Sequence, residues 1–261
     1  MKQIKIQCPA KINLDLRVFP PEEAGFHPIK SIMQTINLYD YLTIKITDGK
    51  GIILSGTSDE IPYDDKNLCY KAAKLFLDKI KQDYKIEIHI EKNIPVCAGL
   101  AGGSTDAAGV LFGLNRILNN PLKKEQLHEL ALELGSDLNF CLEGGTKLCT
   151  GRGEKLTNMP FYDFAVSLVK PKHLKISAKE AYQEFDKLKI ESDMRNDLEF
   201  ALLNSGKYEE LNYLSSKDMQ MSGSGPTYFI RKEKIDFCID KNKYLIIEKL
   251  NSVSHGVIEV E

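Results

Sequence analysis

Residues 94–108, IPVCAGLAGGSTDAA, are the stretch around which this chain is organised. The preceding run IEIHI (86–90) alternates apolar and polar residues, as a half-buried strand does, and an apolar spacing typical of one helix face follows the stretch. A strand, a glycine-rich loop and a helix N-terminus together form an anion site, because glycines let the backbone approach a phosphate and the first helical N–H groups point at it. A glycine-rich turn that only caps a helix has the same composition, so the loop alone leaves both interpretations open.

Composition fits an ordinary enzyme. The formal charge of −2 over 261 residues provides no basic footprint for nucleic acid. No apolar run approaches the roughly 18 residues that cross a bilayer, so we expect no membrane partner. The six cysteines are scattered without a CxxC pair, and the five histidines have no metal spacing. Scattered free thiols are typical of a reducing compartment, and the sequence therefore predicts a cytoplasmic protein.

The remaining elements follow from periodicity and from turn residues. Alternating runs at 4–6 and 12–18 predict two strands interrupted at Cys8-Pro9, since proline breaks a ladder. Gly49-Lys50-Gly51 predicts a hairpin turn after a strand at 42–46. Further strands are expected near 147–150, 164–169, 228–230, 244–247 and 257–260, and helices near 67–80, 107–118, 127–134, 177–188 and 197–203. A change of character near residue 161 predicts two domains, residues 1–155 and 156–261.

Several polar residues stand out, although each has an ordinary structural explanation. Lys11 and Asn13 begin a strand and would be solvated there, while Asp137 lies in an apolar stretch where it could cap a helix. Phe26 and His27 end a proline-rich loop (19–28), which could be a binding loop or a lid that packs on the body. The loop at 99–105 lacks the Lys-Ser/Thr of a Walker P-loop, and neither the dinucleotide-binding fingerprint nor the protein-kinase motifs are present. What remains is a phosphate-binding loop of another type.

Three blocks together are more specific than the loop alone. They are PAKINL (9–14), PVCAGLAGGSTDAA (95–108) and SGSGPT (222–227), and in order and placement they resemble the signature blocks of the galactokinase, homoserine kinase, mevalonate kinase and phosphomevalonate kinase superfamily. The resemblance implies an α+β fold of two domains with an active-site cleft between them. Within the superfamily, four shorter segments are similar to the branch that phosphorylates a cytidine-diphosphate methylerythritol: Gly25-Phe26-His27, Met33-Gln34-Thr35, Gly135-Ser136-Asp137 and Asn196-Asp197-Leu198-Glu199. This branch implies ATP-dependent phosphorylation of the C2 hydroxyl of that small molecule, with Mg²⁺, in non-mevalonate isoprenoid biosynthesis.

The resemblance also implies a role for individual residues. Lys11 and Asp137 would be catalytic, with Asp137 as the general base, and Lys11 and Asn13 would lie at the acceptor hydroxyl. Phe26 would stack on the cytosine, His27 would read its edge, and Tyr182 would be a second stacking partner. Asn67 would lie near the adenine. The residues expected to wrap the triphosphate are Pro95, Val96, Cys97, Ala98, Gly99, Leu100, Ala101, Gly102, Gly103, Ser104 and Thr105. Independently of the resemblance, Ser104, Thr105 and Asp106 could either cap the helix that follows or lend oxygens to a nucleotide's metal.

The chain departs from the superfamily pattern at four positions. Ala101 replaces a glycine and Thr105 a serine, and Asn139 and Arg152 stand where a proline and an aliphatic residue are usual. We expect the loop to tolerate Ala101 if its φ is negative. Two other functions fit the same residues: a related kinase for mevalonate or another small alcohol, and a nucleotide-binding module with weak catalysis.

Overall fold

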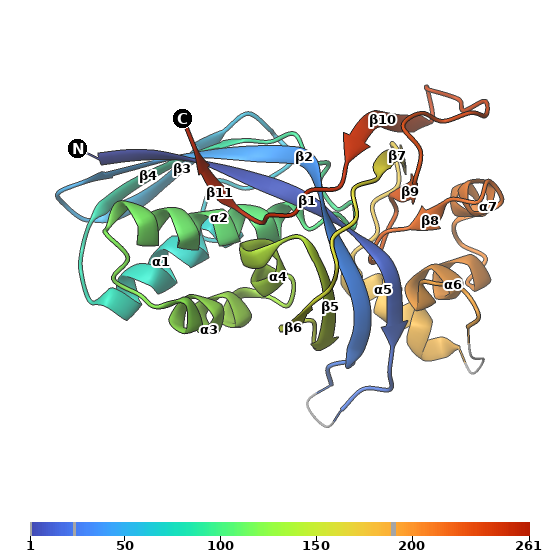
Figure 1. The fold of residues 1–261 in the computed structure, drawn as a ribbon, viewed down its shortest axis with the longest axis horizontal. Coiled ribbons are helices and arrows are strands. Elements are labelled where there is room, and N and C mark those ends of the chain that lie inside the picture. The colour runs from blue at the N-terminus through green and yellow to red at the C-terminus, as the bar shows by residue number, and fades with distance from the viewer. Residues whose placement is uncertain (1, 23–24, 189–191) are drawn as a thin grey trace.

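The computed structural model describes residues 2–22, 25–188 and 192–261, which lie in two sheets and the helices packed against them (Figure 1). Residues 23 and 24 of the expected 19–28 loop lie outside the described residues. The first sheet contains β1 (Lys2–Val18), β2 (Ile29–Thr47), β3 (Gly51–Gly56), β4 (Lys85–Glu91), β5 (Thr146–Gly151), β6 (Lys155–Asn158) and β11 (Ile258–Val260). The second contains β7 (Ala165–Pro171), β8 (Gln220–Met221), β9 (Tyr228–Ile230) and β10 (Tyr244–Asn251). The helices are α1 (Leu68–Ile80), α2 (Gly102–Ile117), α3 (Lys124–Leu134), α4 (Leu138–Glu143), α5 (Ala178–Lys187), α6 (Asp197–Asn204) and α7 (Glu209–Ser215).

The prediction of two strands separated at Cys8-Pro9 is wrong. β1 runs without interruption from Lys2 to Val18 along β2, and its register shifts between Pro9 and Ala10. The bulge on β2 at this point accommodates the proline, which a regular ladder would not. As a result β1 is one long strand that crosses the molecule (Figure 1), and Lys11 on it is buried.

The hairpin expected at Gly49-Lys50-Gly51 is also absent from the described sheet. In the sheet order β11-β1-β2-β4-β3, strand β4 lies between β2 and β3, and β3 pairs with β4 in parallel. Gly49 lies in a bend and Gly51 is the first residue of β3, with φ of 127° and 132°. β2 and β3 are therefore not paired with each other, because β4 lies between them. The chain reaches β4 from β3 through α1, as a parallel connection requires.

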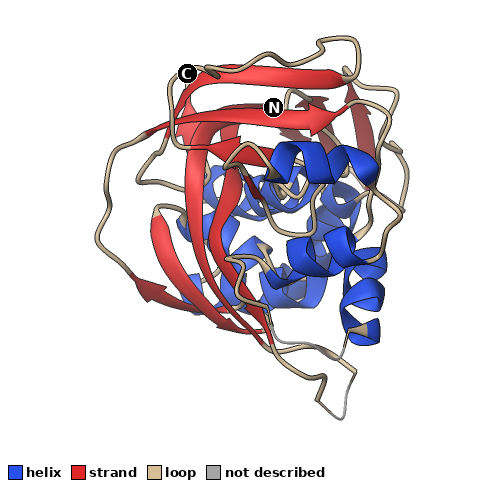
Figure 2. Cartoon of the chain, turned by 90° about the vertical axis from the view of Figure 1, so that its right-hand side faces the viewer, coloured by secondary structure: helices blue, strands red, loops and turns tan. Residues whose placement is uncertain are grey.

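Helices α1 to α4 lie together against one face of the first sheet, and Figure 2 shows the strands curving around the helices. The helix predicted to follow the glycine loop is confirmed as α2, which packs on β1 and β2. Two glycines allow the close approach: a Cβ at Gly109 would lie 2.5 Å from the sulfur of Cys8, and one at Gly113 would lie 2.7 Å from Ile44 Cδ1. This packing fixes the N-terminus of α2, and with it the loop, relative to β1.

The second sheet and helices α5 to α7 form the other side of the molecule (Figure 1). The expected strands at 228–230, 244–247 and 257–260 are confirmed as β9, β10 and β11. β9 has the predicted bounds, β10 extends further to Asn251, and β11 begins one residue later, at Ile258. The α+β class is thereby confirmed. The division at residue 155 stays a prediction, and β11 returns to pair with β1 in the first sheet. None of the helices in the described part of the chain is both long and apolar enough to cross a membrane.

Candidate active site

The glycine loop has an unusual backbone in which the sign of φ alternates. Cys97, Gly99 and Ala101 have φ of 51°, 71° and 59°, while the residues between them do not have positive φ. Such alternation turns successive N–H groups toward one side and creates a concave anion site. The loop was expected to tolerate Ala101 if the φ of this residue is negative, and that condition is not met. Ala101, the residue before α2, adopts the left-handed conformation. The loop keeps its shape with an alanine there, at a cost in strain.

Gly99 is the point where the three sequence blocks meet. A Cβ at Gly99 would lie 2.2 Å from the carbonyl oxygen of Ser222, so no other residue fits. The carbonyl oxygen of Gly99 accepts hydrogen bonds from Ser222 Oγ at 2.9 Å and from Lys11 Nζ at 3.2 Å. The backbone N–H of Asn13 donates to Ser222 Oγ at 3.3 Å, which closes the connection. The sequence places Ser222 in the third block but assigns it no role. In the folded chain its side chain connects the first block with the second.

Lys11 lies buried at the centre of this junction, with only 4% of its side chain exposed. Its Nζ donates to Asn13 Oδ1 at 2.6 Å and lies 3.5 Å from Asp137 Oδ2. Asn13 is held in turn, since its Nδ2 donates to Ser31 Oγ at 2.8 Å. The structure thus brings together Lys11, Asn13 and Asp137, which lie up to 126 positions apart in the numbering of the chain.

Asp137 precedes α4 at the N-cap position, yet its side chain makes no capping hydrogen bond. The simple explanation of a capping aspartate therefore fails, and the carboxylate faces Lys11 instead. About a third of the side chain (30%) is exposed, so a substrate can reach it. Burial raises the pKa of Tyr182 to about 12, and the negative charge of Asp137 adds to the shift, which indicates that α5 faces the same site.

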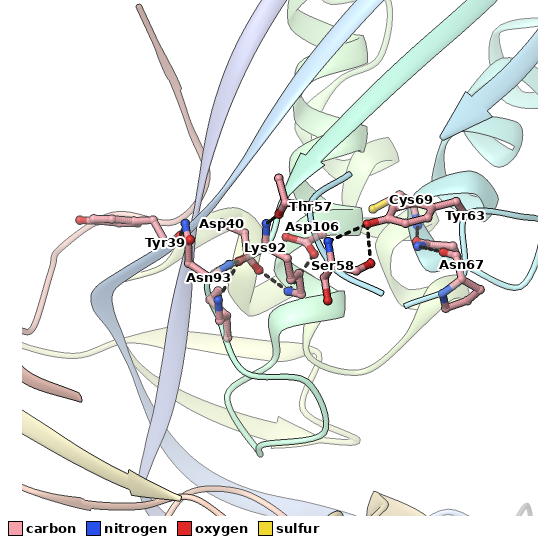
Figure 3. Close-up of polar contacts among 12 residues, drawn as sticks. Tyr39, Asp40, Thr57, Ser58, Tyr63, Asn67, Cys69, Lys92, Asn93 and Asp106 are labelled. Atoms are coloured by element: carbon pink, nitrogen blue, oxygen red, sulfur yellow. Dashed lines mark hydrogen bonds and ion pairs between the residues drawn. The ribbon is translucent and has the colours of Figure 1, made fainter. Parts of the chain in front are cut away.

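A cavity of about 370 Å³ runs along the glycine loop from Asn67 to Asp137. Its lining includes Pro95, Val96, Cys97, Ala98, Gly99, Ala101, Gly102, Gly103 and Ser104, and Ser224 is the contribution from the C-terminal half. Of the expected loop residues, Leu100 and Thr105 are buried and do not line it. Asn67 caps α1, because its Oδ1 accepts from the N–H of Cys69 at 2.8 Å and its Nδ2 donates to the carbonyl oxygen of Pro62 at 2.6 Å (Figure 3). One N–H of the Asn67 amide stays available to a ligand.

A second lysine group borders the cavity, and the sequence singled out only one of its members, Asp106. Lys92 Nζ lies 3.0 Å from Asp106 Oδ2 and also contacts Asp40 Oδ2, with all three side chains almost fully buried (Figure 3). Burial raises the pKa of Asp106 to about 8, and the Lys92 ammonium offsets only part of that shift. Burial by itself would lower the pKa of Lys92, but the negative charges of Asp106 and Asp40 outweigh it and raise this pKa above its usual value. The available signals were an acid, Asp40, between two tyrosines just before the strand predicted at 42–46, and a lysine directly before the loop.

Asp40 fixes the start of the loop. Its Oδ1 accepts from the backbone N–H groups of Asn93 and Ile94, the latter at 2.8 Å (Figure 3). A side chain of β2 thereby holds the chain between β4 and the glycine loop. Because Lys92 pairs with the same carboxylate, Asp40 anchors the loop without being an unpaired buried charge.

The structure brings together some, but not all, of the residues expected to bind the cytosine base. The rings of His27 and Tyr182 lie 5.2 Å apart, and those of His27 and Phe185 lie 5.8 Å apart in an edge-to-face arrangement. Phe26 is half exposed, and the guanidinium of Arg152 lies 3.6 Å from its ring centre. Among the described residues Phe26 has no ring contact with Tyr182, so Tyr182 meets His27 rather than Phe26 in this structure. Arg152, noted in the sequence only as a departure, is the actual neighbour of Phe26.

Comparisons with known proteins agree with this geometry. The family model for the GHMP kinases N terminal domain matches residues 67–145, which include the glycine loop and Asp137. A 4-diphosphocytidyl-2-C-methyl-D-erythritol kinase of Clostridium beijerinckii is 39% identical, over 92% of this chain and 96% of the relative. The enzyme of the same name from Clostridium botulinum (strain Kyoto / Type A2) is 42% identical, over 90% of this chain and 95% of the relative.

Solved structures show the same architecture. The crystal structure of a 4-(cytidine 5'-diphospho)-2C-methyl-D-erythritol kinase superposes with a TM-score of 0.72 at 27% identity, covering 87% of this chain and 89% of that one. The homoserine kinase of Cytophaga hutchinsonii superposes with a TM-score of 0.70 at 16% identity, covering 100% and 98%, which shows a shared fold alone. The fold implied by the three sequence blocks is thereby confirmed.

Proposed function

The chain belongs to the 4-diphosphocytidyl-2-C-methyl-D-erythritol kinase family, and we propose that it transfers the γ-phosphoryl group of ATP to the C2 hydroxyl of that cytidine-diphosphate alcohol. The product would serve the non-mevalonate route to isoprenoid precursors. The observation that carries the catalytic assignment is the contact between Lys11 and Asp137 beside the glycine loop, 3.5 Å apart. A lysine, a phosphate-binding loop and a carboxylate that has no other side-chain partner among the described residues suit phosphoryl transfer to an alcohol.

The glycine loop is proposed to hold the triphosphate of ATP. Its alternating φ values and the N-terminus of the 16-residue helix α2 direct backbone N–H groups and a positive helix end toward the cavity. Such preorganised donors stabilise the charge on the phosphate oxygens without rearranging during the reaction. The adenine would lie at the other end of the cavity, near Asn67.

Asp137 is proposed to accept the proton of the attacking hydroxyl. Phosphoryl transfer requires the protein mainly to position the reactants and to stabilise charge, so a carboxylate within hydrogen-bond reach of the hydroxyl is sufficient as a base. Lys11 contacts both Asp137 and the loop carbonyl of Gly99, so its ammonium would lie between the base and the phosphates. There it would stabilise the developing alkoxide and orient Asn13 toward the acceptor.

Mg²⁺ is proposed to accompany the nucleotide. Among the described residues no three His, Cys, Asp or Glu side chains gather into a ready-made metal site. However, Asp106 Oδ1 is buried without a hydrogen-bond partner, and both Asp106 and Ser104 line the cavity. Hard oxygen ligands from one or two side chains, completed by phosphates, are what Mg²⁺ prefers, so these residues fit the ion. When bound, the ion would offset negative charge on the β- and γ-phosphates.

The cytidine is proposed to bind between the 19–28 loop and α5. Phe26 offers an exposed ring for stacking, and His27 and Tyr182 offer adjoining aromatic groups. Arg152 lies on one face of the Phe26 ring, so the base would stack on the other face.

Purified protein would test the function in an assay of ADP release. We expect turnover with ATP and 4-diphosphocytidyl-2-C-methyl-D-erythritol, and none above background with mevalonate or homoserine. Turnover that ignores the cytidine substrate and responds to mevalonate or homoserine would contradict the substrate assignment. ATP binding without any substrate-dependent ADP release would instead indicate a nucleotide-binding module.

A further inference from the structure

The segment Asn196-Asp197-Leu198-Glu199 resembles the cytidine-substrate branch, yet it does not line the cavity along the glycine loop. It lies at the start of α6, where Asn196 is the N-cap. Its three polar residues are buried: Asn196 is 0% exposed, Asp197 8% and Glu199 1%. Buried polar side chains cost free energy unless they are hydrogen-bonded, so their partners indicate what the segment does.

The segment joins β1 to the third sequence block, residues 222–227. On one side Asp197 Oδ2 accepts from the backbone N–H of Val18, at the end of β1, at 2.8 Å. On the other side Glu199 Oε2 accepts from the backbone N–H of Met221, the last residue of β8, at 3.0 Å. The start of α6 thereby holds together the strand that carries the catalytic lysine and the strand that leads into the third block.

Asn196 lies at the centre of this connection and uses both ends of its amide group. Its Oδ1 accepts from the N–H groups of Leu198 and Glu199, at 3.0 and 3.2 Å, and so caps α6. Its Nδ2 donates to the carbonyl oxygens of Met221 and Gly223, at 2.8 and 2.9 Å. Capping requires only the oxygen, since aspartate and serine cap as well as asparagine does. The NH₂ group therefore serves the third block rather than the helix.

The backbone that Asn196 holds lies directly against Lys11. A Cβ at Gly223 would be 3.0 Å from Lys11 Nζ, so the lysine packs on the bare backbone of this glycine. Ser222, which lies between the two carbonyl groups bound by Asn196, shares the carbonyl oxygen of Gly99 with Lys11. A shift of this backbone would therefore move the ammonium group from its place beside the glycine loop.

We propose that Asn196 is a positioning residue for phosphoryl transfer. Its NH₂ group fixes the backbone of residues 221–223 and thereby the place of the Lys11 ammonium. This inference rests on the proposed function and goes beyond it, because it gives a role to a side chain that does not line the cavity. A charge stabilises the transition state only where negative charge develops, and a displacement of about 1 Å can cost about 100-fold in rate.

The kinetic test is Asn196→Asp, which keeps the size of the side chain and the capping oxygen but removes both hydrogen bonds to the carbonyl groups. We expect kcat with ATP and the cytidine substrate to fall about 10- to 100-fold. KM for ATP should change little, because the glycine loop is still held by Asp40. Asn196→Ser, whose short hydroxyl cannot span both carbonyl groups, adds no charge and should give the same split between kcat and KM.

Asn115→Asp and Asn115→Ser are the matched controls. Asn115 is also buried, at 6% exposed, and lies at the opposite end of α2 from the glycine loop. Its Oδ1 accepts from the N–H of Leu122 at 3.0 Å, and its Nδ2 donates to the carbonyl oxygen of the same residue at 3.1 Å. These variants lose the same kind of bond and should retain the wild-type kcat. Equal losses of kcat at both asparagines would indicate a general loss of packing and contradict the proposal.

The NMR signal of the Lys11 ammonium group tests the inference without any turnover. Lys11→Met identifies the signal by removing it. Both Asn196 variants should shift this signal, whereas both Asn115 variants should leave it in place. An unchanged signal in the Asn196 variants, or a kcat equal to that of wild type, would overturn the proposal. If wild-type protein is inactive on the cytidine substrate and the signal still shifts in the Asn196 variants only, the proposed function is contradicted and the positioning of Lys11 by Asn196 stands.

Discussion

Two lysine–aspartate groups contact the glycine loop, and they differ in the number of carboxylates around the lysine and in the exposure of these carboxylates. Lys11 lies 3.5 Å from Asp137, whose side chain is 30% exposed. Lys92 is enclosed by Asp40 and Asp106, and all three side chains are 5% exposed or less. The carboxylate of the first group is partly exposed beside the cavity, whereas both carboxylates of the second group are buried, and this group ties the loop to β2 through Asp40. We therefore propose that the same residue types serve chemistry at one place and anchoring at the other, according to their exposure.

The largest effect should come from the open group. Asp137→Asn keeps the size of the side chain but removes the base, and kcat should fall about 10²- to 10⁴-fold. Kd for ATP should change little, since the loop is intact, and Tm should stay close to that of wild type because no capping bond is lost. Steady-state kinetics with parallel ATP titration checks this. Wild-type-like kcat would exclude Asp137 as the base.

The closed group should instead determine stability. Lys92→Met leaves the carboxylates of Asp40 and Asp106 buried without their cation, so the free energy of unfolding should fall by about 3–5 kcal/mol. Lys50→Met is the matched control, because Lys50 pairs with Asp83 on the surface, where both side chains are mostly exposed. That control should cost less than about 1 kcal/mol. Urea unfolding measures both, and equal losses would show that Lys92 has no anchoring role.

A buried carboxylate outside both groups, Glu199, sharpens the comparison, because among the described residues it has no cation within ion-pair distance. Burial raises the pKa of Glu199 to about 7, although the N–H of Met221 donates to it. An acid whose pKa is raised on folding binds more protons when folded, so stability is highest at low pH and falls as pH rises from about 4.5 to 7. The loss should reach up to about 3 kcal/mol. Glu199→Gln should remove it.

Urea unfolding at pH 5 and pH 8 checks this expectation. The Glu199→Gln variant should gain stability relative to wild type at the higher pH, because glutamine keeps the size and the acceptor oxygen but has no charge to bury. A pH dependence identical to that of wild type would show that Glu199 does not titrate in this range.

The smallest effect concerns the loop between the two groups. Ala101 has a φ of 59°, a conformation that glycine adopts without strain, so Ala101→Gly should stabilise the protein by about 1 kcal/mol. Ala98→Gly is the control: Ala98 does not have positive φ, and the extra freedom of the unfolded chain should there destabilise by about 0.5–1 kcal/mol. Urea unfolding distinguishes the two. Destabilisation by Ala101→Gly would contradict the strain assigned to this position.

The local elements were predictable because they depend on neighbouring residues. The helix after the loop, the end of α3 at Gly135, and strands such as β9 follow from apolar spacing and from turn residues. The three blocks also predicted the fold, since together they specify a strand, a phosphate loop and a closing turn in one order. Residue types alone could not show that Asp137 leaves its helix uncapped and turns to Lys11.

The amino-acid sequence by itself determined that a glycine loop meets a helix, that Lys11 and Asp137 lie in family motifs, and that the chain is α+β. The tertiary structure decided how Pro9 fits into one long strand, why β3 pairs with β4 rather than β2, and which carboxylates close around Lys92. It also placed Asp186 beside His27, 159 positions away in the numbering. The physical reason is that backbone preference and periodicity are local, whereas strand register, burial and charge pairing depend on partners brought together only when the chain is packed.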